Sequence, residues 1–137
     1  MLLIPPLTAL LLAGSALSAP NPHPKRASRT SAPEGCVTVG GSGTYSTISG
    51  AITALGSSSD DACIYIAAGT YEEQLTFEYG GALTIYGETT DTGSYKQNTV
   101  TITHTITSSE AGSLIASATV NAAMDDIAFY NVNIVNG

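Results

Sequence analysis

The stretch Cys63 to Gly87, CIYIAAGTYEEQLTFEYGGALTIYG, contains three short apolar runs separated by glycine-containing turns. Large apolar residues recur at every second position of each run: Ile64 and Ile66, Leu75 and Phe77, Leu83 and Ile85. This period places each pair on one face of an extended strand, so we expect three successive strands that share a core. Turns that recur about every ten residues fit a sandwich, a barrel or a coiled solenoid, and the local pattern leaves these open.

Two later segments continue the same pattern. Thr99 to Ile106 alternates strictly, which predicts a strand with Val100 and Ile102 on one face. The run from Ile127 to Asn136 changes its apolar phase near Asn131, which predicts a bend there. Asparagines at such a bend are typical of the corners of parallel β-helices, where side-chain amides hydrogen bond between successive turns.

One segment has helical periodicity. Apolar residues lie at i, i+3, i+4 and i+7, namely Ile48, Ala51, Ile52 and Leu55. Ser46 is available as an N-cap and Gly56 as a stop, so a helix is predicted over about 46–55. Its apolar stripe suits a cap over the end of a solenoid. Elsewhere, 88–99 is expected to be a surface loop, 108–112 a turn and 117–121 a short strand.

Composition and the N-terminus indicate a secreted protein of at most one domain. The 137 residues are 43% apolar and only 11% charged, and the formal net charge of −7 offers no basic surface for nucleic acid or anionic membranes. Residues 1–18 have the short apolar run and small residues of a signal peptide. Residues 19–35 are rich in proline and read as a pro-segment or linker, with Lys25-Arg26 as a dibasic processing site.

Few residues are candidates for chemistry from pattern alone. Cys36 and Cys63 suit an oxidising compartment and could form a disulfide, with free buried thiols as the alternative. Two cysteines and two distant histidines do not form a metal-ligand set. The adjacent acids 60–61, 72–73 and 125–126 point to opposite faces if extended, so they are read as solvated turns. His104, on an alternating strand, is read as a packed residue.

The segment 66–74, IAAGTYEEQ, followed by Leu83-Thr-Ile-Tyr-Gly87, resembles the pectin methylesterase (pectinesterase) family, fungal type. Gly69, Tyr71 and Glu73 match the family's G-x-Y-x-E signature, and the resemblance extends from about Gly40 to Gly137. It implies an all-β fold, the N-terminal coils of a right-handed single-stranded parallel β-helix over residues 36–137, with the 46–55 helix as a cap.

The resemblance also implies an activity whose residues this sequence does not contain. The family removes methyl esters from polygalacturonate, the backbone of pectin, without a cofactor. One aspartate attacks the ester, a second acts as acid and base, glutamines form the oxyanion hole and an arginine positions the nucleophile. These residues belong to motifs of the QAV, QDT, DYIFG and LGR-W types, none of which occurs here. We therefore expect an N-terminal fragment that is inactive by itself, from a secreted enzyme that is monomeric at full length.

Two other classes remain as alternatives. A pectate lyase or polygalacturonase would share the architecture, but it needs calcium-binding or paired catalytic aspartates, which the sequence does not show. A non-catalytic β-solenoid that binds wall polysaccharide needs no motif at all. Pectin binding without methanol release would favour the second alternative.

Overall fold

The computed structural model describes residues 27–137. The expected signal peptide, 1–18, and the expected processing site, Lys25-Arg26, lie outside the described residues. Within the described part, no helix is long and apolar enough to cross a membrane.

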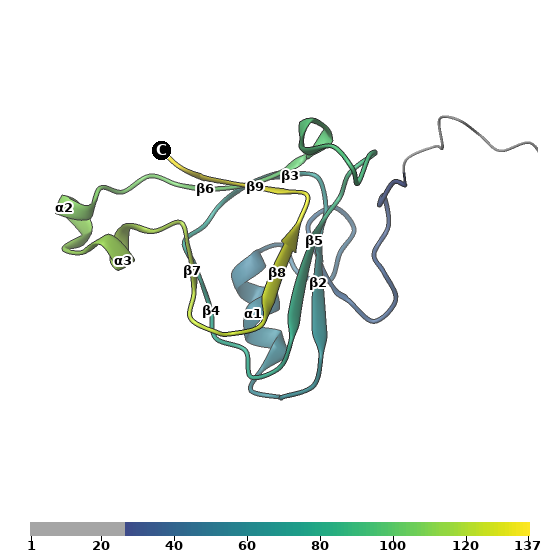
Figure 1. Cartoon of the computed structure of the whole chain (residues 1–137), viewed down its shortest axis with the longest axis horizontal. Coiled ribbons are helices and arrows are strands. Elements are labelled where there is room, and N and C mark those ends of the chain that lie inside the picture. The colour runs from purple at the N-terminus through teal and green to yellow at the C-terminus, as the bar shows by residue number, and fades with distance from the viewer. Residues whose placement is uncertain (1–26) are drawn as a thin grey trace, which may run out of the picture.

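The strands form three sheets in which every neighbouring pair is parallel (Figure 1). The first sheet joins β1 (Val37–Val39), β2 (Ala62–Ile66), β5 (Leu83–Gly87) and β8 (Ile127–Tyr130). The second joins β3 (Gly69–Glu72), β6 (Val100–His104) and β9 (Val132–Asn136), and the third joins β4 (Leu75–Phe77) and β7 (Val120–Ala122). From β2 onward the chain visits the three sheets in the same repeating order, which is the circuit of a parallel β-helix.

The core lies between the sheets and contains the inward residues that the sequence predicts. Ile64, Ile66, Leu75, Phe77, Leu83, Ile85, Val100 and Ile102 are all at most 1% exposed. They stack in register, because Ile64 pairs with Ile85 and Ile85 with Phe129 across the first sheet. Phe129 also meets Phe77 edge to face, with ring centroids 5.6 Å apart, so the third sheet is packed against the first.

Helix α1 (Ile48–Leu55) begins two residues later than the predicted 46–55, and its N-cap is Thr47 rather than Ser46. The Thr47 backbone is extended and its hydroxyl accepts a hydrogen bond from the Gly50 amide at 3.1 Å, which satisfies a free donor of the first turn. The helix ends at Leu55, and its C-cap is Gly56, where φ is 68°. Ile48 and Ala51 are fully buried in the core cluster.

The structure differs from the sequence prediction in three segments. Residues 63–87 contain four strands, because β3, most of whose residues are exposed, has no apolar period to reveal it. Residues 108–112 and 117–121 do not form a simple turn and a strand: they contribute to helices α2 (Ser108–Ala111) and α3 (Leu114–Ser117) and to β7. The surface loop predicted at 88–99 is present; it contains a 3-10 helix, η1 (Tyr95–Gln97), and the fully buried Thr89.

The predicted bend at Asn131 is confirmed. Asn131 has φ of 58°, a left-handed conformation that asparagine tolerates better than most residues, and it separates β8 from β9. Its amide donates to Asn98 Oδ1 at 3.1 Å, and the Asn98 amide donates to Asn133 Oδ1 at 3.1 Å. The corner is therefore joined to the preceding turn of chain by side-chain amides, as the sequence pattern indicates.

Candidate functional site

Of the three signature residues, Glu73 contacts the start of helix α1, from which it is distant in sequence. Gly69 opens β3, where its φ of 155° falls in a region that side-chain-bearing residues rarely adopt, and Glu73 follows the end of the strand. Glu73 Oε2 accepts from the Ile48 amide at 2.8 Å, and Oε1 accepts from the Ser49 amide at 3.0 Å and the Ser49 hydroxyl at 2.8 Å. Both carboxylate oxygens are thus bound to the first turn of α1.

This position suits a carboxylate for two reasons. The first amides of a helix have no partner within the helix, and the N-terminus carries the positive end of the helix dipole. Glu73 therefore works together with the Thr47 cap to fix where α1 begins. Because both of its oxygens are occupied in this way, its geometry is that of a positioning residue.

Tyr71, two residues before Glu73, contacts the segment after β2 and the glycine turn after β1. Its hydroxyl donates to the Ala67 carbonyl at 2.7 Å. Burial raises the pKa of the Tyr71 phenol, and the charges of Glu73 and Glu88 raise it further. Gly40, with φ of 75°, lies against the Tyr71 hydroxyl, and a Cβ atom there would overlap it. The neutral phenol therefore packs beneath the Gly40 turn as a hydrogen-bond donor.

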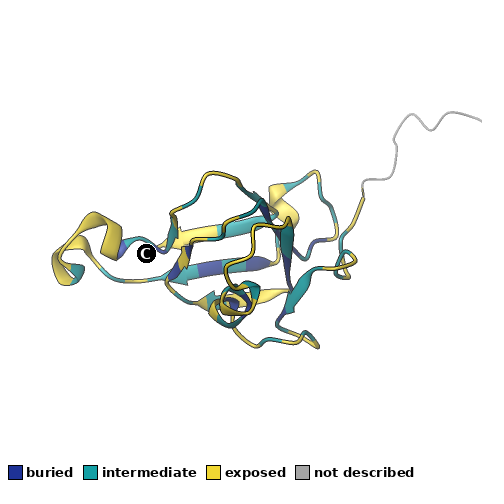
Figure 2. Ribbon diagram, turned by 90° about the horizontal axis from the view of Figure 1, so that it is seen from below, coloured by how far each residue is buried: buried dark blue, intermediate teal, exposed yellow. Residues whose placement is uncertain are grey.

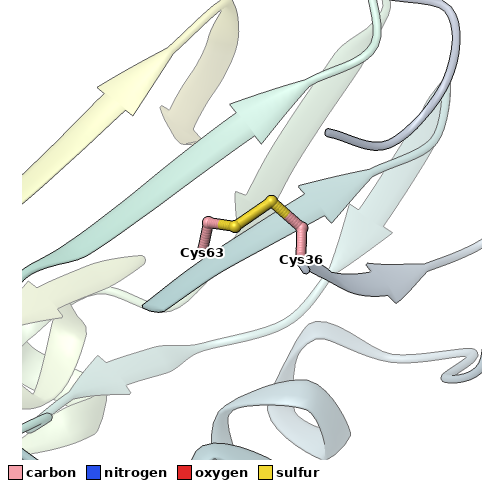
Figure 3. Close-up of a disulfide and its surroundings, with 2 residues drawn as sticks. All are labelled: Cys36 and Cys63. Carbon is pink, nitrogen blue, oxygen red and sulfur yellow. A yellow bond between two sulfur atoms is a disulfide. The ribbon is translucent and has the colours of Figure 1, made fainter. Parts of the chain in front are cut away.

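A disulfide joins Cys36 and Cys63, with Cα atoms 4.7 Å apart (Figure 3). Cys36 precedes β1 and Cys63 lies on β2. The covalent link encloses the segment that contains the glycine turn and α1. The described residues contain no free cysteine and no cluster of three or more side chains that could bind a metal.

A cavity of about 400 Å³ lies between residues 30–32 and the glycine loop 40–43. Its wall includes Tyr65 and Glu88, and Glu88 Oε1 accepts from the Tyr65 hydroxyl at 3.3 Å and the Ala68 amide at 3.2 Å. Burial, followed by the charge and hydrogen bond of Glu88, raises the pKa of Tyr65 to about 12. Glu88 is the only carboxylate in the lining, so the cavity does not hold a carboxylate pair.

The remaining sequence candidates do not gather into a site. Asp60, Asp61, Asp125 and Asp126 are exposed, in agreement with their reading as solvated turns. The same reading of 72–73 is wrong, because Glu72 belongs to β3 and the Glu73 carboxylate binds the start of α1. His104 is half-buried at the end of β6.

Sequence reasoning missed Gln74, whose side chain holds the segment between β6 and β7. Its amide donates to the carbonyls of Ala116 and Ala118, the latter at 3.0 Å. This segment, with α2 and α3, projects from the body and is largely exposed (Figures 1 and 2). Thr107 and Glu110 form a capping box at α2, and hydrogen bonds from Thr107 lower the pKa of Glu110. In the sequence, the pattern T-x-x-E at 107–110 is the only signal for this capping box.

The comparison with known proteins identifies the family. The chain is 72% identical to pectinesterase A of Emericella nidulans over 131 residues, which are 96% of this chain and 40% of the relative. The chain belongs to the pectinesterase family. It is also 65% identical to a probable pectinesterase A of Aspergillus niger over 127 residues, which are 92% of this chain and 39% of that protein. No protein-family model matches the chain.

A solved pectin methylesterase from Aspergillus niger has the same fold. It superposes with a TM-score of 0.80 and 66% sequence identity, over 81% of this chain and 37% of the solved one. The parallel sheets described above are therefore similar to those of this pectin methylesterase over the aligned part. The chain spans about two fifths of the length of the curated pectinesterases that it matches.

Proposed function

We propose that this chain forms the N-terminal coils of a secreted pectin methylesterase, an enzyme that hydrolyses the methyl esters of polygalacturonate. The observation that carries the proposal is the superposition on a solved pectin methylesterase, at 66% identity over 81% of the chain. In this reading the strands build a right-handed β-helix, and α1 caps the first coil because Ile48 and Ala51 are buried against it.

The chemistry of ester hydrolysis resides in residues other than those described here. Glu73 and Tyr71 hold α1 and the glycine turn, and the family's catalytic glutamine, aspartate and arginine motifs do not occur in the sequence. The role of this part of the enzyme is to start the β-helix and fix the register of the coils that follow. Pectin is the proposed substrate of the complete enzyme, and no cofactor is required.

A chimera tests this proposal directly. Residues 1–137 are joined, at the aligned position, to the remaining part of the Aspergillus niger pectin methylesterase, and methanol release from highly methylated pectin is measured. We expect methanol from the chimera and none from residues 1–137 alone. A chimera that folds, as judged by circular dichroism, and still releases no methanol would contradict the assignment.

The rival class is tested in the same preparations. Co-sedimentation of the 137-residue chain with insoluble pectin, without methanol release from the folded chimera, would favour a non-catalytic polysaccharide-binding solenoid. Methanol release by the chain alone would refute the statement that its own residues lack the chemistry. The names of the relatives favour ester hydrolysis over the lyase and polygalacturonase alternatives.

A further inference from the structure

The cavity of about 400 Å³ beside the glycine loop is built from three separate parts of the chain. Its lining comes from the arm at 30–32, from β1 and the glycine loop at 38–43, and from the ends of β2 and β5, where Tyr65 and Glu88 lie. A volume of this size falls within the range of small-molecule sites, about 300–1,000 Å³. Neither Tyr71 nor Glu73 belongs to the lining, so the cavity is separate from the residues that position α1.

The arm is held in place by Arg29, the residue that precedes its lining segment. The Arg29 amide donates to the Thr89 carbonyl at 2.8 Å, and the Thr89 amide donates to the Arg29 carbonyl at 2.9 Å. The Arg29 guanidinium lies 4.6 Å from the centre of the Tyr86 ring, within cation–π range, and donates to Asn131 Oδ1 at 3.2 Å. Thr89 is itself fully buried. This wall of the cavity is therefore anchored to the body of the protein.

The glycine loop that forms the opposite wall has internal hydrogen bonds of its own. The Gly40 amide donates to the Tyr45 carbonyl at 2.8 Å, and the Gly43 amide donates to the Gly40 carbonyl at 2.7 Å. Gly40 and Gly41 have φ of 75° and 55°, conformations that glycine adopts without strain. The cavity is therefore formed before any ligand arrives, which lowers the cost of binding.

Several polar groups of the lining have no hydrogen-bond partner among residues 27–137. Glu88 Oε1 accepts from the Tyr65 hydroxyl and the Ala68 amide, whereas Oε2 accepts from no described residue. The other groups of this kind are the hydroxyls of Thr30, Ser31 and Ser42 and the amide of Gly41. Free donors and free acceptors in one cavity suit a ligand that carries many hydroxyls, because a hydroxyl both donates and accepts.

The charge of the cavity restricts the ligand further. Glu88 is the only charged side chain in the lining. Burial raises the pKa of Tyr65 most, and of the nearby charges Glu88 raises this pKa more than Arg29 lowers it. The cavity therefore disfavours an anion. The amide and hydroxyl donors do not suit a cation, which leaves an uncharged ligand with several hydroxyls.

We propose that this cavity binds one uncharged pyranose ring, and that Glu88 selects a methyl-esterified galacturonate unit over the free acid. Glu88 Oε2 accepts from the sugar hydroxyls, and the glycine loop donates to them. The choice of galacturonate rests on the proposed function, because the methyl ester is the uncharged unit of the proposed substrate and hydrolysis turns it into an anion. The cavity thus retains unreacted pectin and releases the product.

A titration followed by nuclear magnetic resonance tests the proposal on the isotopically labelled 137-residue chain. The two ligands are methyl galactopyranosiduronate as its methyl ester and as its ionised free acid, which differ by one methyl group. We expect the ester to shift the amides of 40–43 and of Ala68, with a dissociation constant on the order of 1 mM for a ligand of this size. The free acid should bind at least about fivefold more weakly.

Two results would overturn the proposal. One is the absence of a saturable shift of these amides up to about 50 mM ester, well above the expected dissociation constant. The other is equal affinity for the ester and the acid. This comparison uses the unmodified chain, so it stands even if a variant fails to fold.

Matched variants test the role assigned to Glu88. Glu88→Gln keeps a carbonyl acceptor and removes the charge, so it should reduce the preference for the ester to less than about twofold. Glu78→Gln, at an exposed residue just after β4 and outside the lining, is the control and should leave both affinities unchanged. A preference that survives Glu88→Gln, in a variant shown to be folded by circular dichroism, would refute selection by Glu88.

The titration and the methanol assay can fail independently. If the chimera releases methanol and the cavity binds neither sugar, the inference drawn from the cavity is wrong and the proposed function stands. If the cavity prefers the ester and a folded chimera releases no methanol, the proposed function is wrong and the cavity is a sugar-binding site.

Discussion

Replacing Glu73 gives the sharpest test of how the signature works. Glu73→Ala removes the acceptor of the Ile48 and Ser49 amides and of the Ser49 hydroxyl. Loss of a helix cap lowers the free energy of unfolding by about 1 kcal/mol. Loss of a carboxylate at the positive end of a helix lowers it by a further amount of about 0.3–1 kcal/mol. We therefore expect the free energy of unfolding to fall by about 1.3–2 kcal/mol.

Urea unfolding followed by far-ultraviolet circular dichroism measures this difference. Glu73→Gln keeps a carbonyl acceptor but removes the charge, so it should lose about half as much. The control is Glu72→Ala at the exposed neighbouring position, where the loss should stay below about 0.5 kcal/mol. If Glu73→Ala were no more destabilising than Glu72→Ala, the positioning role assigned to Glu73 would be wrong.

Three further outcomes follow from the same region. Because the folded-state pKa of Tyr65 is raised to about 12, the contribution of its neutral phenol to stability is complete below pH 10 and is lost as the pH rises through 12. In alkaline thermal melts, Tyr65→Phe should therefore show a smaller fall in melting temperature with rising pH. Gly40→Ala should cost more than Gly112→Ala in urea unfolding, about 2–3 against 1 kcal/mol, because both have positive φ but only Gly40 lies against Tyr71. Reducing the disulfide, whose cysteines are 27 residues apart, should lower the free energy of unfolding by about 3–4 kcal/mol, and an unchanged urea midpoint would refute this.

The elements that sequence predicts best are those whose side chains alternate between core and solvent. β2, β4, β5 and β6 are found where their apolar period places them, because burial of every second residue leaves a local trace. β3 leaves no such trace, since three of its four residues are exposed. It is a strand because it hydrogen bonds to β6, which its own sequence does not reveal. The α2 and α3 segment escaped prediction for a related reason: it projects from the core, so no apolar period is imposed on it.

In the candidate site, too, some features are recognisable in the sequence and others appear only in the folded chain. The signature Gly69, Tyr71 and Glu73 is recognisable in the sequence, but nothing nearby indicates that Glu73 binds a helix 25 residues earlier. Arg29 reads as one more basic residue of a linker until its contact with Asn131 is seen. Contacts of this kind depend on which strands become neighbours, which local periodicity does not encode.

By itself, the sequence determined the all-β class, the inward residues of the core, the bend at Asn131 and the resemblance to pectin methylesterases, because each depends on residues close together in the chain. Only the tertiary structure decided which residues meet. Parallel coils bring each segment beside one that lies a full circuit earlier, and the long-range partners of Glu73, Gln74 and Arg29 are set by this stacking of the whole chain. The register is a property of the whole stack of strands, and it therefore appears only when the chain is folded.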